Sequence, residues 1–151
     1  MMTSHPDRTT AAGGGRLGQT YVAAILALAG ASMLATGLWA GAAPRSFARF
    51  VEFPFHEHFL HDLGAFQVGI GVTLLLALAW RDAAAVALAG FLVANTLHAV
   101  SHAIDLELGG RASDPYAIGA VSLLVAAALV LRVRQPRAPT PVSGDRQAQP
   151  R

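Results

Sequence analysis

The side chains in this chain that are best suited to chemistry are histidines, and five of the six gather in two short stretches. These five are His56, His58, His61, His98 and His102, and the carboxylates Asp62 and Asp105 lie among them. Both stretches border apolar blocks that are long enough to cross a bilayer. Ionisable side chains at membrane depth are costly, so they mark a functional site or a paired polar network by default.

The spacing of these residues predicts that they meet at one level. Asn95, His98, His102 and Asp105 follow one another at intervals of three, four and three, which places them on one face of a helix. His61 and His102 lie equally far along the chain from a polar turn at Arg81 and Asp82. In an uninterrupted helical hairpin both imidazoles would reach the same height, roughly 30 Å from that turn.

Three kinds of site fit this pattern, and the sequence leaves them open. Imidazole and carboxylate ligands suit zinc, copper or iron, and the predicted metal ligands are His58, His61, Asp62, His98, His102 and Asp105. Haem b held axially is the second possibility, with cofactor-binding residues His61, His98 and His102. The third is a polar network without a cofactor, which holds the helices together or titrates near neutrality as a proton relay or pH sensor.

Independent catalysis is not expected. The chain has no HExxH, GxSxG or phosphate-loop motif, and it has too few histidines for the repeated boxes of membrane di-iron enzymes. The absence of cysteine excludes disulfides, thiolate metal sites and covalently attached haem. No folded basic face is available for nucleic acid, because five of the eleven arginines follow the last apolar block as an anchor and tail.

The elements that must position these residues are membrane helices. The chain of 151 residues is 54% hydrophobic and only 13% charged, and its apolar blocks predict spans at about 20–41, 63–80, 83–103 and 115–133. We therefore expect an all-α integral membrane four-helix bundle. An amphipathic Phe-rich segment, 44–62, should lie at the membrane surface between the first and second helices. The predicted organisation is a disordered leader at 1–18, a four-span transmembrane domain at 19–134 and a disordered tail at 135–151.

The distribution of arginine predicts the orientation. The leader, the Arg81 turn and the C-terminal tail carry most of the arginines and alternate with the Phe-rich segment and the 104–114 loop. The positive-inside rule makes the arginine-rich side cytoplasmic, so both termini would lie inside a bacterial cytoplasmic (inner) membrane. A cleaved signal peptide that ends near Ala40-Gly41-Ala42 is a rival interpretation of the first block, although its apolar run is long for one.

The order Asp62-Leu63-Gly64 at the start of the second span, together with the His98–Asp105 stripe, resembles small four-span bacterial membrane proteins of unknown function with a DoxX-like hydropathy plan. The resemblance implies the fold. We expect an accessory or binding subunit whose working surface is the outer His/Asp cluster. Its partners would be the lipid bilayer and other membrane subunits or further copies of the chain. The alternatives are a metal- or haem-binding redox component and an oligomeric proton-linked transporter or pH sensor.

Overall fold

The computed structural model describes residues 8–135, and this part of the chain is helical without a β-strand. Its four long helices are α1 (Arg8–Ala42), α3 (Glu57–Ala79), α4 (Ala84–Ile104) and α5 (Asp114–Arg134). Each contains a stretch long and apolar enough to span a membrane. The short helix α2 (Pro44–Phe50) and one 3₁₀ turn (Arg81–Ala83) lie between them. The predicted class is confirmed: the chain is an all-α, multi-pass membrane bundle.

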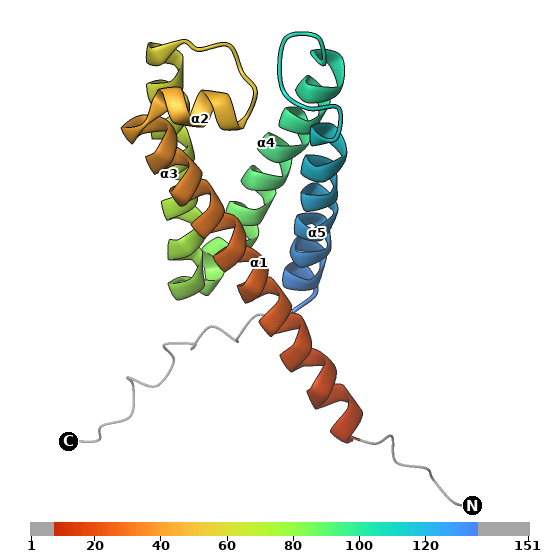
Figure 1. The fold of residues 1–151 in the computed structure, drawn as a ribbon. Helices are drawn as coiled ribbons and strands as arrows, with labels where there is room; N and C mark the ends of the chain where they lie inside the picture. Colours follow the sequence, from red (N-terminus) through yellow and green to blue (C-terminus); the bar gives the residue numbers. More distant parts are fainter. Residues whose placement is uncertain (1–7, 136–151) are drawn as a thin grey trace, which may run out of the picture.

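The four long helices run alternately up and down (Figure 1). Helix α2 and the connection between α4 and α5 lie at one end of the bundle, which we call the α2 end. The Arg81 turn lies at the other end, which we call the Arg81 end, together with the start of α1 and the finish of α5. The polar segments between the helices therefore alternate between the two ends of the bundle, as the sequence predicted.

Two helices begin earlier than the sequence predicted. Helix α3 begins at Glu57 because His56 caps it: the His56 Nδ1 accepts the Phe59 N–H at 3.1 Å, which satisfies an otherwise unpaired donor. Helix α1 begins at Arg8, within the stretch 1–18 predicted as a leader. Adding residues to a helix that already exists costs far less than starting one. The remainder of the predicted leader, and the predicted tail from residue 136 onward, lie outside the described residues.

Helices α1 and α3 approach each other closely through glycine. A Cβ atom on Gly37 would lie 2.8 Å from the carbonyl oxygen of Gly64, and one on Gly71 would lie 2.7 Å from the backbone nitrogen of Leu34. The two backbones are therefore in direct contact, as small residues permit in membrane helix pairs. Gly64 and Gly71 thus admit a neighbouring helix, whereas Gly69 has nothing within 4 Å of its Cβ position.

Helices α4 and α5 are joined by polar side chains. Buried Asn95 donates from Nδ2 to the Ile118 carbonyl and to the Ser122 hydroxyl, both at 2.9 Å. The Thr96 hydroxyl donates to the same Ser122 oxygen at 3.1 Å. Such bonds replace water where the bilayer offers none. Asn95, a member of the predicted polar stripe, therefore serves helix packing.

The bundle is consequently two helix pairs, α1 with α3 and α4 with α5. The pairs share one apolar core toward the Arg81 end, where Leu26, Leu74, Leu88 and Val125 are at most 2% exposed. A separate cluster at the α2 end joins α2 to α1 and α3 through Ala40, Phe47, Ala48 and Leu60. Helices α3 and α4 meet at the Arg81 turn and move apart toward the α2 end (Figure 1).

Candidate ligand-binding chamber at the α2 end

The histidines at the start of α3 face solvent or the membrane surface. His56 serves as the helix cap described above, and His58 Nε2 lies 3.5 Å from a carboxylate oxygen of Asp62, one turn later. The side chains of His58 and Asp62 are 83% and 58% exposed, and His61 is exposed as well. An ion pair this exposed contributes little to stability. None of these side chains lines the chamber described below.

The histidines of α4, in contrast, form a pair. The His98 and His102 rings lie edge to face, with their centroids 4.6 Å apart, as one helical turn between them dictates. The His102 Nδ1 lies 3.8 Å from Oδ2 of Asp114, at the first turn of α5. The sequence placed the two imidazoles together correctly, but their carboxylate neighbour is Asp114, which it did not single out.

The six predicted metal ligands are not assembled into one site. In residues 8–135, no group of three or more His, Asp or Glu side chains is arranged so that it could hold a metal ion. The geometry gives the reason. His58, His61 and Asp62 belong to the α1–α3 pair and the other three to the α4–α5 pair, and the pairs diverge at this end. Equal height along two helices does not bring side chains together when the axes separate.

Between the two pairs lies a chamber of about 390 Å³. Its size falls within the range of small-molecule sites. One side is formed by aromatic rings from α2 and from the segment around the start of α3: Phe47, Phe50, Phe53 and Phe59. The opposite side carries the His98–His102 pair with Asp114. Gln67, from within the membrane-spanning part of α3, also lines it.

A second cavity of about 290 Å³ adjoins the chamber and extends along the α4–α5 connection to Asp105 and Leu108. The two cavities share four wall residues, which are Phe53, Phe59, His98 and His102. Phe53 and Phe59 are stacked, with centroids 5.5 Å apart. The imidazole pair therefore stands between the chamber and an outer vestibule. Asp105 faces the vestibule, separate from Asp62.

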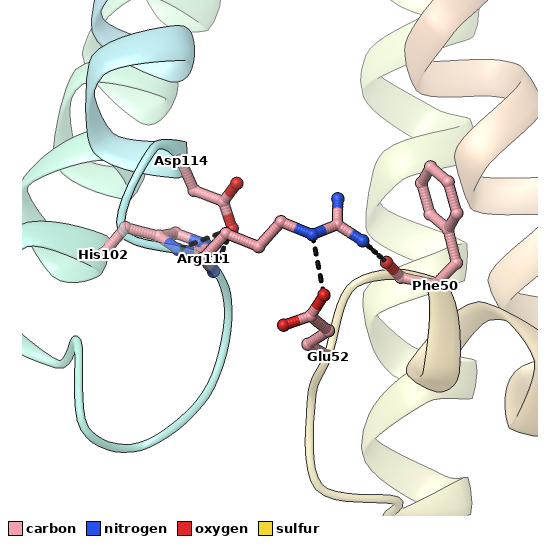
Figure 2. A network of polar contacts seen from close by, with 5 residues as sticks. All are labelled: Phe50, Glu52, His102, Arg111 and Asp114. Carbon is pink, nitrogen blue, oxygen red and sulfur yellow. Dashed lines mark hydrogen bonds and ion pairs between the residues drawn. The ribbon is translucent and has the colours of Figure 1, made fainter.

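Arg111, from the α4–α5 connection, lines the chamber and reaches across to Glu52 and Phe50 of the other helix pair (Figure 2). Its Nε donates to Oε1 of Glu52 at 2.8 Å, and its Nη2 donates to the Phe50 carbonyl at 2.7 Å. The Gly110 N–H donates to the Glu52 carbonyl at 3.0 Å. We call Arg111, Glu52 and Phe50 the Arg111 clasp. It ties together the two helix pairs where their axes are farthest apart.

Backbone geometry supports the clasp. Glu52 has a φ of 54°, a left-handed conformation that costs free energy in a residue other than glycine. Gly110, its hydrogen-bond partner, has a φ of 84°, which only glycine adopts readily. Within the connection, Asp114 Oδ2 also accepts the Arg111 N–H at 2.8 Å. Both loops are therefore held in specific conformations by the contacts that join them.

Three parts of this site were not predicted from the sequence, namely Asp114, Arg111 and Gln67. Of the three, Gln67 could have been recognised from the sequence, because it is a polar side chain well inside an apolar span. Nothing in the local sequence pairs Arg111 with Glu52, which lies in another helix pair.

Comparison of the chain with family models, with curated proteins and with solved structures finds no match. The resemblance to proteins with a DoxX-like plan stays a prediction. The geometry of the chamber is thus the basis for proposing a function.

Proposed function

We propose that this protein is a small accessory or binding subunit of a bacterial cytoplasmic membrane, without catalysis of its own, and that it binds a small molecule in the chamber. Its working side chains are the His98–His102 pair and Asp114, on the side of the membrane opposite both termini. The partners are the lipid bilayer and other membrane subunits.

The observation that carries this proposal is the chamber itself. It combines an apolar aromatic wall with a few convergent polar groups, the composition typical of ligand sites. It also lies where the two helix pairs separate, a position at which bundles often build their sites. Glu52 keeps a left-handed conformation, which costs free energy, while it accepts a hydrogen bond from Arg111, and this favours a functional contact between the helix pairs over an accidental gap.

The test is to fill the chamber and determine whether a bound molecule is lost. Ala117 lines the chamber, whereas Ala120, which is similarly exposed on the same helix, lies outside it. Wild type, Ala117→Phe and Ala120→Phe would be purified in mild detergent and examined by native mass spectrometry. We expect one co-purifying small molecule in the wild type and in Ala120→Phe, and at least a tenfold lower occupancy in Ala117→Phe. Equal occupancy in all three proteins would refute the chamber as the binding site.

A redox component is the second candidate, and the adjacency of His98 and His102 is the observation in its favour. Elemental analysis and an absorption spectrum of the same preparations distinguish the two. The proposed function predicts no stoichiometric zinc, copper or iron and no Soret band. A stoichiometric metal that disappears in the double variant His98→Ala, His102→Ala would establish the redox alternative in its place.

A further inference from the structure

A cleft of about 200 Å³ lies at the Arg81 end of the bundle, the end opposite the chamber. Two arginines line it: Arg81, from the 3₁₀ turn between α3 and α4, and Arg132, from the last turn of α5. Gln19 of α1 also lines it. Three parts of the chain that are far apart in sequence therefore contribute polar side chains to one cleft, which we call the arginine cleft.

The position of Arg132 in this cleft is fixed by hydrogen bonds. Its Nε and Nη2 both donate to the Arg81 carbonyl, at 3.3 and 2.7 Å. These two bonds orient the planar guanidinium beside the turn that carries Arg81, and they leave further N–H groups of the guanidinium for another acceptor. A guanidinium held in this way suits the oxygens of a phosphate, which it can meet with two N–H groups at once.

No carboxylate balances these two arginines within residues 8–135. All three ion pairs of the described residues lie at the α2 end. Asp82 is the one carboxylate that the described residues place at the Arg81 end, and it is exposed and does not line the cleft. Two like charges that line one small cleft repel each other, and an anion between them lowers that cost. The charge of the cleft therefore favours an anionic occupant.

The wall of the cleft changes from polar to apolar with depth in the membrane. Helix α1 runs away from the Arg81 end and α3 runs toward it, so Ala23 lies deeper than Gln19, and Leu78 lies deeper than Arg81 (Figure 1). Ala23 and Leu78 are exposed. Trp80, beside Arg81, is 62% exposed, as is typical of a side chain at the membrane–water interface. A phospholipid has the same order, with its charged headgroup outermost and its acyl chains deeper.

We propose that the arginine cleft binds an anionic phospholipid of the leaflet at the Arg81 end. Its phosphate lies against Arg81 and Arg132, and its acyl chains follow the exposed apolar surface past Ala23 and Leu78. The volume of about 200 Å³ suits a headgroup and not a whole lipid, so the chains stay in the bilayer. Basic pockets between membrane helices commonly bind such headgroups. Soluble phosphodiesters share this headgroup chemistry, but the apolar deeper wall favours the lipid.

The test measures lipid binding to the full chain in a neutral detergent by native mass spectrometry. Phosphatidylglycerol is the anionic probe, and phosphatidylcholine with identical acyl chains is the zwitterionic reference. The proteins are wild type, Arg81→Gln and the control Arg134→Gln. Arg134 is exposed at the same end of α5 and does not line the cleft, so both variants lose one positive charge but only Arg81→Gln alters the cleft. Arg81→Gln also keeps the backbone carbonyl to which Arg132 donates.

We expect wild type and Arg134→Gln to bind phosphatidylglycerol about tenfold more tightly than phosphatidylcholine, whose choline would add a further cation beside the arginines. Arg81→Gln should lose most of this preference and retain about threefold or less. Equal affinities for the two lipids in the wild type would overturn the proposal. So would a preference that survives in Arg81→Gln, or one that falls equally in Arg134→Gln. The wild-type comparison stands by itself if Arg81→Gln fails to fold.

A third probe separates the lipid from a soluble phosphodiester. Glycerophosphoglycerol is the headgroup of phosphatidylglycerol without acyl chains, and it should not displace the bound lipid at equal concentration. Displacement at equal concentration would show that the cleft binds a soluble anion, and would overturn the assignment to a lipid. The chamber is not involved in this proposal, so Ala117→Phe should keep the wild-type preference for phosphatidylglycerol.

Discussion

Asn95 illustrates how one polar side chain contributes to a membrane protein. Two acceptors on α5 satisfy its side-chain amide nitrogen, and the residue is only 9% exposed. Hydrogen bonds between membrane helices contribute about 0.6 kcal/mol on average and rarely more than about 1.7 kcal/mol, because the separated helices also find partners. The stabilising effect of Asn95 is therefore modest but specific to the α4–α5 pair.

Replacement of Asn95 by alanine should accordingly lower the free energy of unfolding by about 1–2 kcal/mol. Unfolding in mixed detergent micelles, followed by circular dichroism, measures this quantity. Thr73→Val is the matched control and should change stability by less than about 0.5 kcal/mol, because Thr73 is exposed and bonds to Gly69 of its own helix. A stability of Asn95→Ala equal to that of the control would show that the contact with Ser122 contributes nothing.

At the scale of elements, the contact between α1 and α3 depends on the absence of side chains at their crossing. Gly37 faces Gly64, and Gly71 faces the backbone of Leu34, with no room for a methyl group on either side. This crossing places α3 against α1 and so leaves α4 to pair with α5. It also makes α1 part of the fold, since cleavage near Ala40–Ala42 would remove the surface that covers Gly64 and Gly71.

Glycine-to-alanine substitutions on α3 test this crossing with an internal control. Gly71→Ala should destabilise the protein by about 1–3 kcal/mol, because the new methyl group would lie 2.7 Å from a backbone atom that cannot move alone. Gly69→Ala should leave stability unchanged or raise it by up to about 1 kcal/mol, since nothing lies within 4 Å and alanine favours helix. Thermal unfolding of both variants compares them directly. An equal effect of the two substitutions would contradict the close contact.

At the scale of the whole molecule, the arrangement is polarised. One end contains the shared apolar core and the Arg81 turn, where Arg132 of α5 donates from Nη2 to the Arg81 carbonyl at 2.7 Å. The other end contains the chamber, the vestibule and the Arg111 clasp. The helix pairs are thus fixed together at the Arg81 end, whereas at the α2 end the clasp bridges them. A molecule that enters the chamber would do so at the end where the pairs are apart.

The orientation of this polarised molecule can be tested cleanly because the chain has no cysteine. Glu107 lies at the α2 end and Asp82 at the Arg81 end, and both are exposed. With single cysteines at these positions, a membrane-impermeant maleimide applied to spheroplasts should label Glu107→Cys readily. Asp82→Cys should react only after the membrane is permeabilised, as the positive-inside rule requires. The reverse pattern would place the chamber on the cytoplasmic side.

The sequence by itself determined the features that depend on local periodicity and composition. Four apolar blocks were sufficient to predict four spanning helices, and a spacing of four residues was sufficient to place the His98 and His102 rings together. These properties follow from the helix itself, in which residues three or four apart are always neighbours.

Only the tertiary structure decided which helices pair. The prediction that His61 and His102 reach one level assumed that consecutive helices stay side by side, but α3 packs on α1 and α4 packs on α5. That choice separates the two groups of histidines, brings Asp114 to His102 and Arg111 to Glu52, and leaves Gln67 at the wall of a cavity. Pairing depends on the fit of whole helix surfaces that are far apart in the chain, and no local pattern contains that information.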